Sequence, residues 1–178
     1  MLTTRQIKTP RKGVVRPITS RVKSAIFSIL GEKIEGKEIL DLFAGLGTLG
    51  IEALKRGAEK VVFIEIVPGY AEKIKDGLQK QGFYDKGKVI KGDARKWIRR
   101  LVKEGEKFDI VFLDPPYGSG LGRKVLEAEN FPQLLNENAT VILREFWRET
   151  EGKEAPHSLK VKEKRKYGEM VITFLTLP

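Results

Sequence analysis

One tetrapeptide combines the groups that could hold a reacting amine. It reads Asp114-Pro115-Pro116-Tyr117 and directly follows the apolar residues 110–113. Two consecutive prolines lack backbone N–H donors and fix φ, so the chain cannot continue as a strand and forms a rigid turn. The Asp114 carboxylate and the Pro115 carbonyl can accept two N–H bonds, and the Tyr117 ring can stack on a flat base. We therefore predict a catalytic site for a planar ring with an exocyclic NH2 group, rather than a turn that only stiffens the end of a strand.

A glycine-rich loop lies earlier in the chain. Gly45, Gly47 and Gly50 satisfy the dinucleotide-binding pattern G-x-G-x-x-G, and Glu65 follows twenty residues after the first glycine. Glycines let a backbone approach a ligand closely, and a carboxylate at the position of Glu65 can accept both hydroxyls of a ribose. A nicotinamide-dependent oxidoreductase is therefore one interpretation of this loop.

Asp41, four residues before the first glycine, favours another ligand. Its carboxylate would face a cation rather than a pyrophosphate, and an oxidoreductase would leave the Asp114 tetrapeptide without a role. S-adenosylmethionine has a sulfonium cation, an amino acid part and a ribose, and it accounts for Asp41, the glycines and Glu65 together. Asp93 adds an acceptor where an adenine amino group would lie. The predicted cofactor-binding residues are Asp41, Phe43, Ala44, Gly45, Gly47, Gly50, Glu65, Ile66, Asp93, Ala94 and Asp114.

Positive charge is concentrated at the start of the chain. The 178 residues carry a net charge of +10, and residues 1–31 contain seven Lys and Arg side chains but no Asp or Glu. A segment with charge of one sign is typical of proteins that bind a phosphate backbone. Residues 160–166 form a second basic patch, interrupted only by Glu163. The predicted RNA-binding residues are Arg5, Lys8, Arg11, Lys12, Arg16, Arg21 and Lys23.

The composition excludes several classes of protein. Hydrophobic residues make up 40% and charged residues 33% of the chain, as in a globular protein of one domain. Cysteine is absent, which excludes disulfides and thiolate zinc sites, and we predict no metal site. No apolar stretch approaches the ~20 residues of a membrane span, and no signal-peptide segment opens the sequence. We therefore expect a cytoplasmic protein that does not associate with a membrane.

Apolar periodicity and turn residues predict alternating strands and helices. The predicted strands cover residues 38–43, 60–65, 87–91, 108–113 and 140–145. The predicted helices cover the stretch from Thr19 or Ser20 to Gly31 and residues 49–56, 68–81, 95–103, 123–129 and 132–135. This alternation indicates an α/β fold with a parallel sheet. Residues 158–164 and 169–176 are too close in sequence for a crossover helix, so we expect a hairpin with an antiparallel last strand.

The order of these motifs resembles the amino-methyltransferases of nucleic acids. More narrowly, residues 16–27 (RPITSRVKSAIF) resemble the helix motif Arg-Pro-Thr-x-x-Arg-x-Arg-x-x-x-Phe of the RsmD-type enzymes, although Ile18 replaces a common Thr and Ser20 a frequent Asp. Those enzymes methylate the exocyclic N2 amine of one guanine in bacterial small-subunit (16S) ribosomal RNA. The resemblance implies a Rossmann-like class I methyltransferase fold, with a seven-stranded, mostly parallel sheet, an antiparallel last strand and helices on both faces. It also implies S-adenosylmethionine as cofactor and ribosomal RNA as partner, either naked or within a partly or fully assembled small subunit.

Residues 1–17 are then expected to form a basic N-terminal arm and residues 18–178 a single methyltransferase domain. Other substrates stay open, because adenine or cytosine of DNA and the glutamine amide of a protein present the same NH2 hydrogens. A non-catalytic RNA-binding module would need the arm but not the glycine loop. Among the remaining aromatic residues, we expect Trp97 to lie in the core, whereas Phe146 and Trp147 could pack internally or contact substrate. We expect His157 to have no catalytic role.

Overall fold

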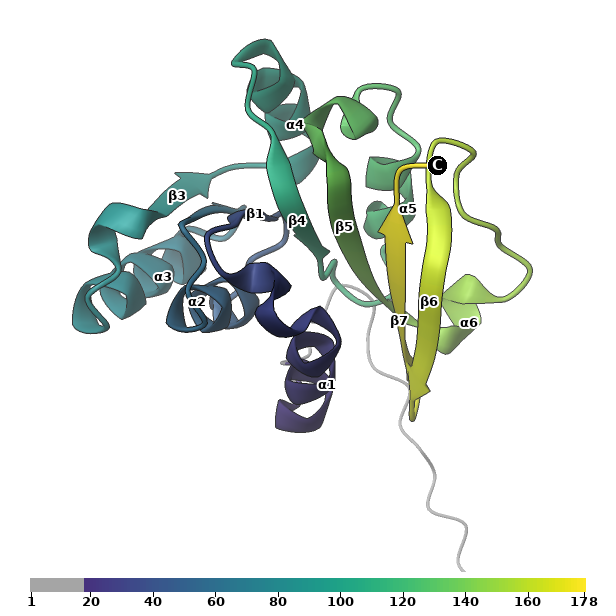
Figure 1. Cartoon of the computed structure of the whole chain (residues 1–178), viewed down its shortest axis with the longest axis horizontal. Helices are drawn as coiled ribbons and strands as arrows, with labels where there is room; N and C mark the ends of the chain where they lie inside the picture. The colour runs from purple at the N-terminus through teal and green to yellow at the C-terminus, as the bar shows by residue number, and fades with distance from the viewer. Residues whose placement is uncertain (1–17) are drawn as a thin grey trace, which may run out of the picture.

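The computed structural model describes residues 18–178, which form one seven-stranded sheet (Figure 1). The strand order is β3-β2-β1-β4-β5-β7-β6; the strands are parallel from β3 to β5, and β7 is antiparallel to both β5 and β6. The predicted α/β fold and its inserted antiparallel last strand are thus confirmed. The strands are β1 (Glu38–Asp41), β2 (Lys60–Glu65), β3 (Gly87–Lys91), β4 (Phe108–Leu113), β5 (Leu135–Phe146), β6 (Lys160–Tyr167) and β7 (Met170–Thr176).

Helices cover both faces of the sheet, as expected (Figure 1). Successive residues of a strand point to opposite faces, so Phe112 of β4 joins the hydrophobic cluster under α1, α2 and α3, whereas Val111 joins the cluster under α4 and α5. The α-helices are α1 (Ser20–Leu30), α2 (Thr48–Lys55), α3 (Pro68–Lys80), α4 (Ala94–Lys103), α5 (Leu121–Leu126) and α6 (Trp147–Thr150). No helix among residues 18–178 is long and apolar enough to cross a membrane.

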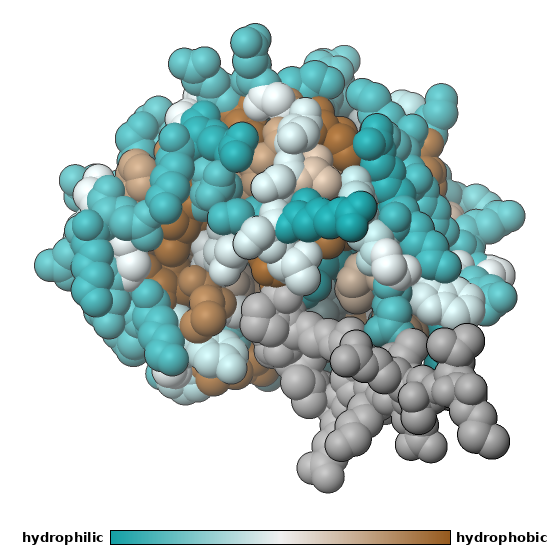
Figure 2. Space-filling view, turned by 90° about the horizontal axis from the view of Figure 1, so that it is seen from below, coloured by the Kyte–Doolittle hydropathy of each residue, from teal (hydrophilic) through white to brown (hydrophobic). Residues whose placement is uncertain are grey.

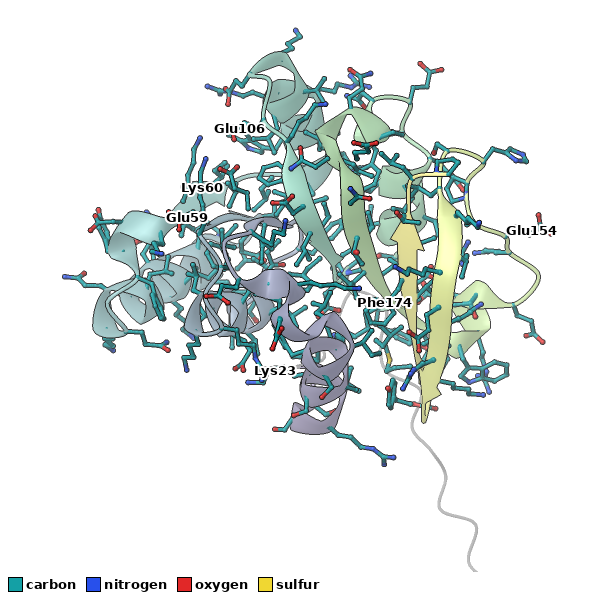
Figure 3. All side chains as sticks on the ribbon, viewed as in Figure 1. Lys23, Glu59, Lys60, Glu106, Glu154 and Phe174 are labelled. Carbon is teal, nitrogen blue, oxygen red and sulfur yellow. The ribbon has the colours of Figure 1, made fainter. Side chains whose placement is uncertain are left out.

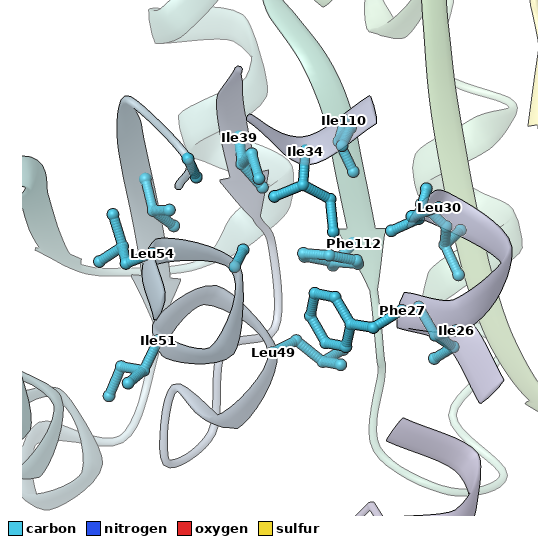
Figure 4. Close-up of a cluster of buried hydrophobic side chains, with 14 of the residues drawn as sticks. Ile26, Phe27, Leu30, Ile34, Ile39, Leu49, Ile51, Leu54, Ile110 and Phe112 are labelled. Carbon is cyan, nitrogen blue, oxygen red and sulfur yellow. The ribbon is translucent and has the colours of Figure 1, made fainter. Parts of the chain in front are cut away.

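Helix α1 is packed firmly onto the sheet. The Thr19 hydroxyl accepts a hydrogen bond from the Val22 N–H (3.3 Å) and caps the first turn, and Gly31 ends the helix with φ of 54°. The buried ring of Phe27 packs against Phe112 with ring centroids 6.0 Å apart, at the centre of the cluster in Figure 4. Removing such a buried ring typically costs about 3–5 kcal/mol. This packing holds residues 18–27, the described part of the helix motif, beside the ends of the central strands.

The structure corrects several predicted element boundaries. Strand β5 spans Leu135–Phe146 rather than residues 140–145, and α5 spans Leu121–Leu126 rather than residues 123–129. A 3₁₀ helix at Phe131–Leu134 replaces the helix expected at residues 132–135. The hairpin turns at Gly168, with φ of 59°, so β6 continues past the predicted end at residue 164. Sequence patterns also missed α6, since one turn of helix has too few residues to show periodicity.

Ion pairs at the amino ends of β2 and β3 tie these strands to the loop before β4. The Lys60 ammonium lies 3.4 Å from the Glu106 carboxylate, and both side chains are labelled in Figure 3. Lys88 of the neighbouring strand lies 3.9 Å from the same carboxylate. Partly exposed surface pairs of this kind contribute about 0–1 kcal/mol each, so the hydrophobic clusters and not these pairs hold the fold together.

Candidate active site

The carboxyl ends of β1, β2, β4 and β5 surround a cavity of about 400 Å³. Ligands of open α/β sheets bind at this edge, because the strand ends and the loops that follow them converge there. The structure brings most of the predicted site residues together here. The predicted catalytic and cofactor-binding residues that line the cavity are Asp41, Phe43, Ala44, Gly45, Glu65, Ile66, Asp93, Ala94, Asp114, Pro115, Pro116 and Tyr117.

Two of the predicted cofactor-binding glycines do not line the cavity. Gly47 precedes α2 with φ of 73°, a conformation that side chains rarely adopt. A Cβ atom on Gly50 would lie 2.2 Å from the Phe63 ring, so this glycine permits the close packing of α2 on β2. Gly47 and Gly50 therefore allow the conformation of the loop and the packing of α2 without lining the cavity, whereas Gly45 lines it.

The Glu65 carboxylate fastens the glycine loop to the end of β2. Its Oε2 accepts a hydrogen bond from the Gly45 N–H (2.6 Å) and its Oε1 accepts one from the Val67 N–H (2.8 Å). Only 7% of the residue is exposed. Each carboxylate oxygen can accept two hydrogen bonds, so the same group can still receive hydroxyl donors from a ligand in the cavity.

Asp41 is almost completely buried at the end of β1, with 1% of its surface exposed. Its Oδ2 accepts a hydrogen bond from the Gly50 N–H at 3.2 Å. The pKa of Asp41 is raised to about 8, mainly by burial and in part by the neighbouring carboxylates of Asp114 and Glu65, whereas the Gly50 N–H opposes the rise. A buried carboxyl group in this position favours a cationic ligand, because a positive charge would offset the cost of ionising it.

Asp114 forms an ion pair with Arg144 of β5, which sequence analysis did not identify. The Arg144 Nε donates to Asp114 Oδ1, and both side chains line the cavity. Burial raises the pKa of Asp114, and the charge and hydrogen bond of Arg144 oppose that rise. The guanidinium therefore favours the ionised, hydrogen-bond-accepting form of the carboxyl group that sequence analysis assigned to catalysis.

An aromatic pair forms one wall of the cavity. The ring of Tyr117 meets the ring of Phe146 edge to face, with centroids 5.0 Å apart and an interplanar angle of 75°. Phe146 is 3% exposed and Tyr117 is half-buried. Phe146 is therefore packed against Tyr117 and also lines the cavity. Edge-to-face pairs contribute about 0.5–1.5 kcal/mol beyond area burial, so the contact holds the Tyr117 ring in one orientation.

Asp93 lies at the cavity but is already engaged. Its carboxylate caps α4 by accepting from the Arg95 N–H (2.9 Å) and forms an ion pair with the Arg95 guanidinium (2.6 Å). The Arg95 hydrogen bond lowers the pKa of Asp93. An adenine amino group would therefore share this carboxylate with Arg95, which also lines the cavity.

Glu145, another cavity residue absent from the sequence predictions, is held by Arg123 of α5. Two parallel hydrogen bonds join the Arg123 guanidinium to the Glu145 carboxylate (2.9 and 3.1 Å), and a third reaches the Glu154 carbonyl (3.0 Å). Burial raises the pKa of Glu145 while Arg123 opposes the rise. The pair joins α5, β5 and the loop after α6, and so fixes the loops on this side of the cavity.

The predicted RNA-binding residues fall into three groups. Arg5, Lys8, Arg11, Lys12 and Arg16 lie outside the described residues. Arg21 of α1 is exposed, as a phosphate-binding side chain must be. Lys23, labelled in Figure 3, instead forms an ion pair with Glu52 of α2 at 3.0 Å. Its charge is therefore partly neutralised within the protein.

The other residues singled out by sequence analysis lie away from the reacting groups. Trp97 of α4 packs against Gly92, where an added Cβ would lie 2.2 Å from its Nε1, and against the cluster under α4. Because its ring is only half-buried, it lies at the margin of the core rather than inside it as predicted. His157 is exposed in the loop before β6. Within residues 18–178 no group of three or more His, Cys, Asp or Glu side chains is arranged to hold a metal ion.

Comparisons with known proteins agree with this geometry. The family model described as "Conserved hypothetical protein 95" matches residues 1–176. The "Putative rRNA methyltransferase YlbH" of Bacillus subtilis is 33% identical over 164 residues, which cover 92% of this chain and 89% of that protein. The "Ribosomal RNA small subunit methyltransferase D" of Haemophilus influenzae is 34% identical over 130 residues, which cover 72% of this chain and 67% of that protein.

A solved structure shares the arrangement of the whole sheet. The "Putative methyltransferase yhhF from Escherichia coli" superposes with a TM-score of 0.76 at 25% identity, over 94% of this chain and 92% of that one. The strand order with β7 inserted between β5 and β6 is that of the class I methyltransferases. The chain therefore belongs to the conserved hypothetical protein 95 family, the RsmD family of methyltransferases.

Proposed function

We propose that this protein transfers a methyl group from S-adenosylmethionine to the exocyclic N2 amine of a guanine in small-subunit ribosomal RNA. The observation that carries the proposal is the position of Asp114, whose carboxylate lies in the same cavity as Asp41 and Glu65 and is held there by Arg144. A substrate acceptor and the cofactor acceptors thus face one space. The names of the relatives supply the class of substrate, and the resemblance of residues 16–27 to the RsmD-type motif supplies the guanine amine.

The cavity residues fit the proposed cofactor. Glu65, beside the glycine loop, would accept the ribose hydroxyls, and Asp93 would accept from the adenine amine. Asp41, whose pKa is raised to about 8, would be ionised by the nearby sulfonium. S-adenosylmethionine would supply an electrophilic methyl group with a neutral thioether as leaving group.

The residues after β4 would prepare the amine. The lone pair of a guanine N2 amine is delocalised into the ring, so the nitrogen is a poor nucleophile. Asp114 and the Pro115 carbonyl would accept its two hydrogens and direct the lone pair toward the methyl carbon, while Tyr117 stacks on the base. Transfer would form the new N–C bond as the C–S bond breaks, and the electron pair of the broken bond would remain on sulfur. The excess proton on nitrogen then passes to Asp114 or to water, so no base of raised pKa is required before transfer.

We further propose that residues 18–178 act as one methyltransferase domain and that residues 1–17 act as an RNA-binding arm in the cytoplasm, where ribosomal subunits assemble. The five positive charges of residues 1–17, which no Asp or Glu accompanies, support the arm. The substrate is then either free 16S RNA or an assembled small subunit. The base must leave its stack or come from a loop to enter the cavity.

Mass spectrometry of nucleosides tests the proposal directly. Unmodified 16S RNA and small subunits that lack the modification would each be incubated with the protein and isotope-labelled S-adenosylmethionine. We expect labelled N2-methylguanosine, and comparing the two substrates identifies the one that is used. Label in adenosine, in cytidine or in protein glutamine would contradict the proposed substrate, and binding of NADH without S-adenosylmethionine binding would contradict the cofactor.

Asp114→Asn is the matched variant, because the amide keeps the size of the side chain but replaces one acceptor oxygen with a donor. We expect transfer to fall by at least about 100-fold, a loss typical of removing one aligned catalytic group. Affinity for S-adenosylmethionine, measured by calorimetry, should stay within a few-fold of the wild-type value. An equal loss of binding and transfer would show that Asp114 holds the cofactor rather than the amine.

A further inference from the structure

A second aromatic and cationic surface lies outside the cavity, at α6. The half-buried ring of Trp147 has two cations near its face: Lys166 Nζ lies 4.7 Å and Arg148 Cζ lies 5.4 Å from the ring centroid. Both cationic side chains are exposed. Figure 1 shows α6 beside the lower part of β6, which brings residues that are distant in sequence to one place. We call Trp147, Arg148, Lys164 and Lys166 the Trp147 surface.

The pairing of β6 explains why lysines gather beside this ring. Lys164 pairs with Thr173 and Lys166 with Val171, so the two lysines, two residues apart, point to the same face of the strand. Arg165, between them, points to the other face and forms an ion pair with Glu163. A shift in register between Val161 and Glu163 sets this alternation. The register therefore separates the lysines beside Trp147 from the acid of the same strand.

Residues 18–178 do not neutralise the cations of this surface. Among residues 18–178 neither Arg148 nor Lys166 forms an ion pair, in contrast to Arg123 and Arg165, whose charges meet carboxylates. Hydrophilic residues also dominate the face seen from below in Figure 2. Cations that only shielded a packed tryptophan would not need to gather on one exposed face of β6, opposite the face that carries Glu163. The surface is therefore suited to an anionic ligand with a flat ring.

A series of rings connects this surface to the cavity. Tyr117 meets Phe146 at 5.0 Å, and Phe146 meets Trp147 at 6.4 Å with an interplanar angle of 40°. Phe146 lines the cavity, while Trp147 lies one residue further along, at the start of α6. A ligand chain that leaves the cavity past Tyr117 would thus reach Trp147 next.

We propose that Trp147 stacks a nucleotide base that flanks the target guanine, and that Arg148, Lys164 and Lys166 bind the phosphates beside it. The inference rests on the proposed RNA substrate and adds the site that holds the neighbouring nucleotides. Single-stranded RNA is recognised by this combination of an aromatic platform and a cationic track. The surface would hold the strand in an unstacked form and so keep the target base inside the cavity.

Binding of unmodified 16S RNA by variants tests the stacking role. Trp147→Ala should weaken binding by about 5- to 150-fold, the range expected for loss of one stacked base, whereas Trp147→Phe should retain most of the affinity. Melting temperatures of both variants would show that they are folded. Wild-type affinity in Trp147→Ala would overturn the inference, and so would an equal loss in Trp147→Phe.

The salt dependence of binding tests the cations. Arg148→Ala and Lys166→Ala should each lower the log–log salt slope by about 0.7 to 0.9, the contribution of one phosphate contact. Arg100→Ala is the matched control, because Arg100 also lies over a tryptophan ring, 4.6 Å from the centroid of Trp97, but on α4. It removes the same charge and should leave the slope unchanged. An equal change in all three variants would indicate a general charge effect and overturn the proposed contacts.

Fluorescence supplies a readout that the packing role alone would not give. The chain has two tryptophans, so the emission of the Trp97→Phe variant comes from Trp147 alone. If that variant does not fold, the difference between the emission of the wild type and that of Trp147→Phe isolates the same signal. Titration with 16S RNA should quench this emission at the concentration at which RNA binds. If wild-type protein methylates guanine N2 but the emission does not change, only this inference fails. If wild-type protein neither binds nor methylates RNA, the proposed function fails with it.

Discussion

The guanidinium of Arg144 lies against the carboxylate of Asp114 because Leu143 and Leu113, the residues before them, are paired neighbours in β5 and β4. The ion pair is thus a direct consequence of sheet register. It places a positive charge next to the carboxylate that is proposed to hold the substrate amine. Since burial raises the pKa of Asp114 and Arg144 opposes the rise, the arginine controls the ionisation of that carboxylate.

Replacing Arg144 should therefore change the pH dependence of methyl transfer. In Arg144→Gln the pKa of Asp114 rises further, so the acid limb of the single-turnover rate should move to higher pH. Arg144→Lys keeps the charge and should move it less. Arg56→Gln, which breaks the Arg56–Glu52 pair (2.8 Å) on the surface of α2, serves as the control and should leave the profile unchanged. An unshifted acid limb in a folded Arg144→Gln protein would mean that Arg144 does not act through Asp114.

Asp41 should couple cofactor binding to pH. Its pKa of about 8 means that the empty protein holds a proton on Asp41 at neutral pH, and a bound sulfonium would expel that proton. Affinity for S-adenosylmethionine should rise with pH, by up to tenfold per unit, and level off above about pH 8. S-adenosylhomocysteine has a neutral sulfur and should show a flatter curve. Calorimetry in buffers of different ionisation enthalpy measures the released proton directly.

Asp41→Asn provides the check on this coupling, because it should flatten the curve for S-adenosylmethionine toward that of S-adenosylhomocysteine. Parallel pH curves for the two ligands in the wild-type protein would contradict the role of Asp41.

The raised pKa of Asp41 also affects the stability of the protein without any ligand. Unfolding returns the carboxyl to its ordinary pKa of 3.8, so the empty protein should lose stability as pH rises from about 4 to about 8. Thermal melting should show a smaller loss in Asp41→Asn.

The Tyr117 ring should matter for its face and not for its hydroxyl. Tyr117→Phe keeps both the stacking surface and the edge-to-face contact with Phe146, so kcat/KM for RNA should stay within a few-fold of the wild-type value. Tyr117→Ala removes the surface and should lower kcat/KM by about 5- to 150-fold. Steady-state kinetics with 16S RNA or small subunits compare the two. Equal losses in the two variants would instead assign the role to the hydroxyl.

Gly50 should be sensitive to a single added methyl group. In Gly50→Ala the Cβ would lie 2.2 Å from Phe63 and 2.9 Å from Val61, so α2 must move away from β2. We expect a loss of about 1–3 kcal/mol in the free energy of unfolding, measured in urea. Gly69 of α3 is the control, because its Cβ would meet no atom within 4 Å and its φ is not positive. Gly69→Ala should be neutral or stabilise by up to about 1 kcal/mol.

Much of this fold can be predicted from the sequence because the central strands are buried on both faces. Residues 61–64 and 110–113 read as unbroken apolar runs, and glycines end several helices, so element order and sheet class follow. Motif spacing likewise identified Asp41, Gly45, Glu65 and the residues after β4. These signals are local, because each lies within one strand or in the loop that follows it.

The pairs across the sheet could not be predicted in the same way. The contact between Arg144 and Asp114 depends on the register of β4 and β5, and that register shifts between Phe108 and Ile110. Nothing in the local sequence marks such a bulge. The Trp147 surface likewise depends on the register shift in β6 and on a helix of four residues. Sequence spacing indicates which residue types are present, whereas these contacts require the pairing of distant segments.

The basic arm should act on RNA binding and not on the cofactor. Arg5, Lys8, Arg11 and Lys12 carry four positive charges before Gly13, and no acid accompanies them. If each binds one phosphate, counterion release contributes about 3 to 4 to the log–log salt slope, the range spanning single-stranded and duplex RNA. Deleting residues 1–12 should flatten the slope by that amount and raise the KM for RNA, whereas calorimetry should show unchanged affinity for S-adenosylmethionine.

Arg21→Ala separates the arm from the mouth of the cavity. Arg21 is exposed on α1, the helix that follows Ile18 at the cavity wall. Loss of the Arg21 side chain should therefore lower both turnover on RNA and affinity for RNA, because it would alter how the RNA strand enters the cavity. Loss of residues 1–12, in contrast, should leave the single-turnover rate at saturating RNA unchanged. If the truncated protein keeps the wild-type salt slope and RNA affinity, the four arm charges make no phosphate contacts. In that case, the basic residues from 13 onward must supply the electrostatic attraction.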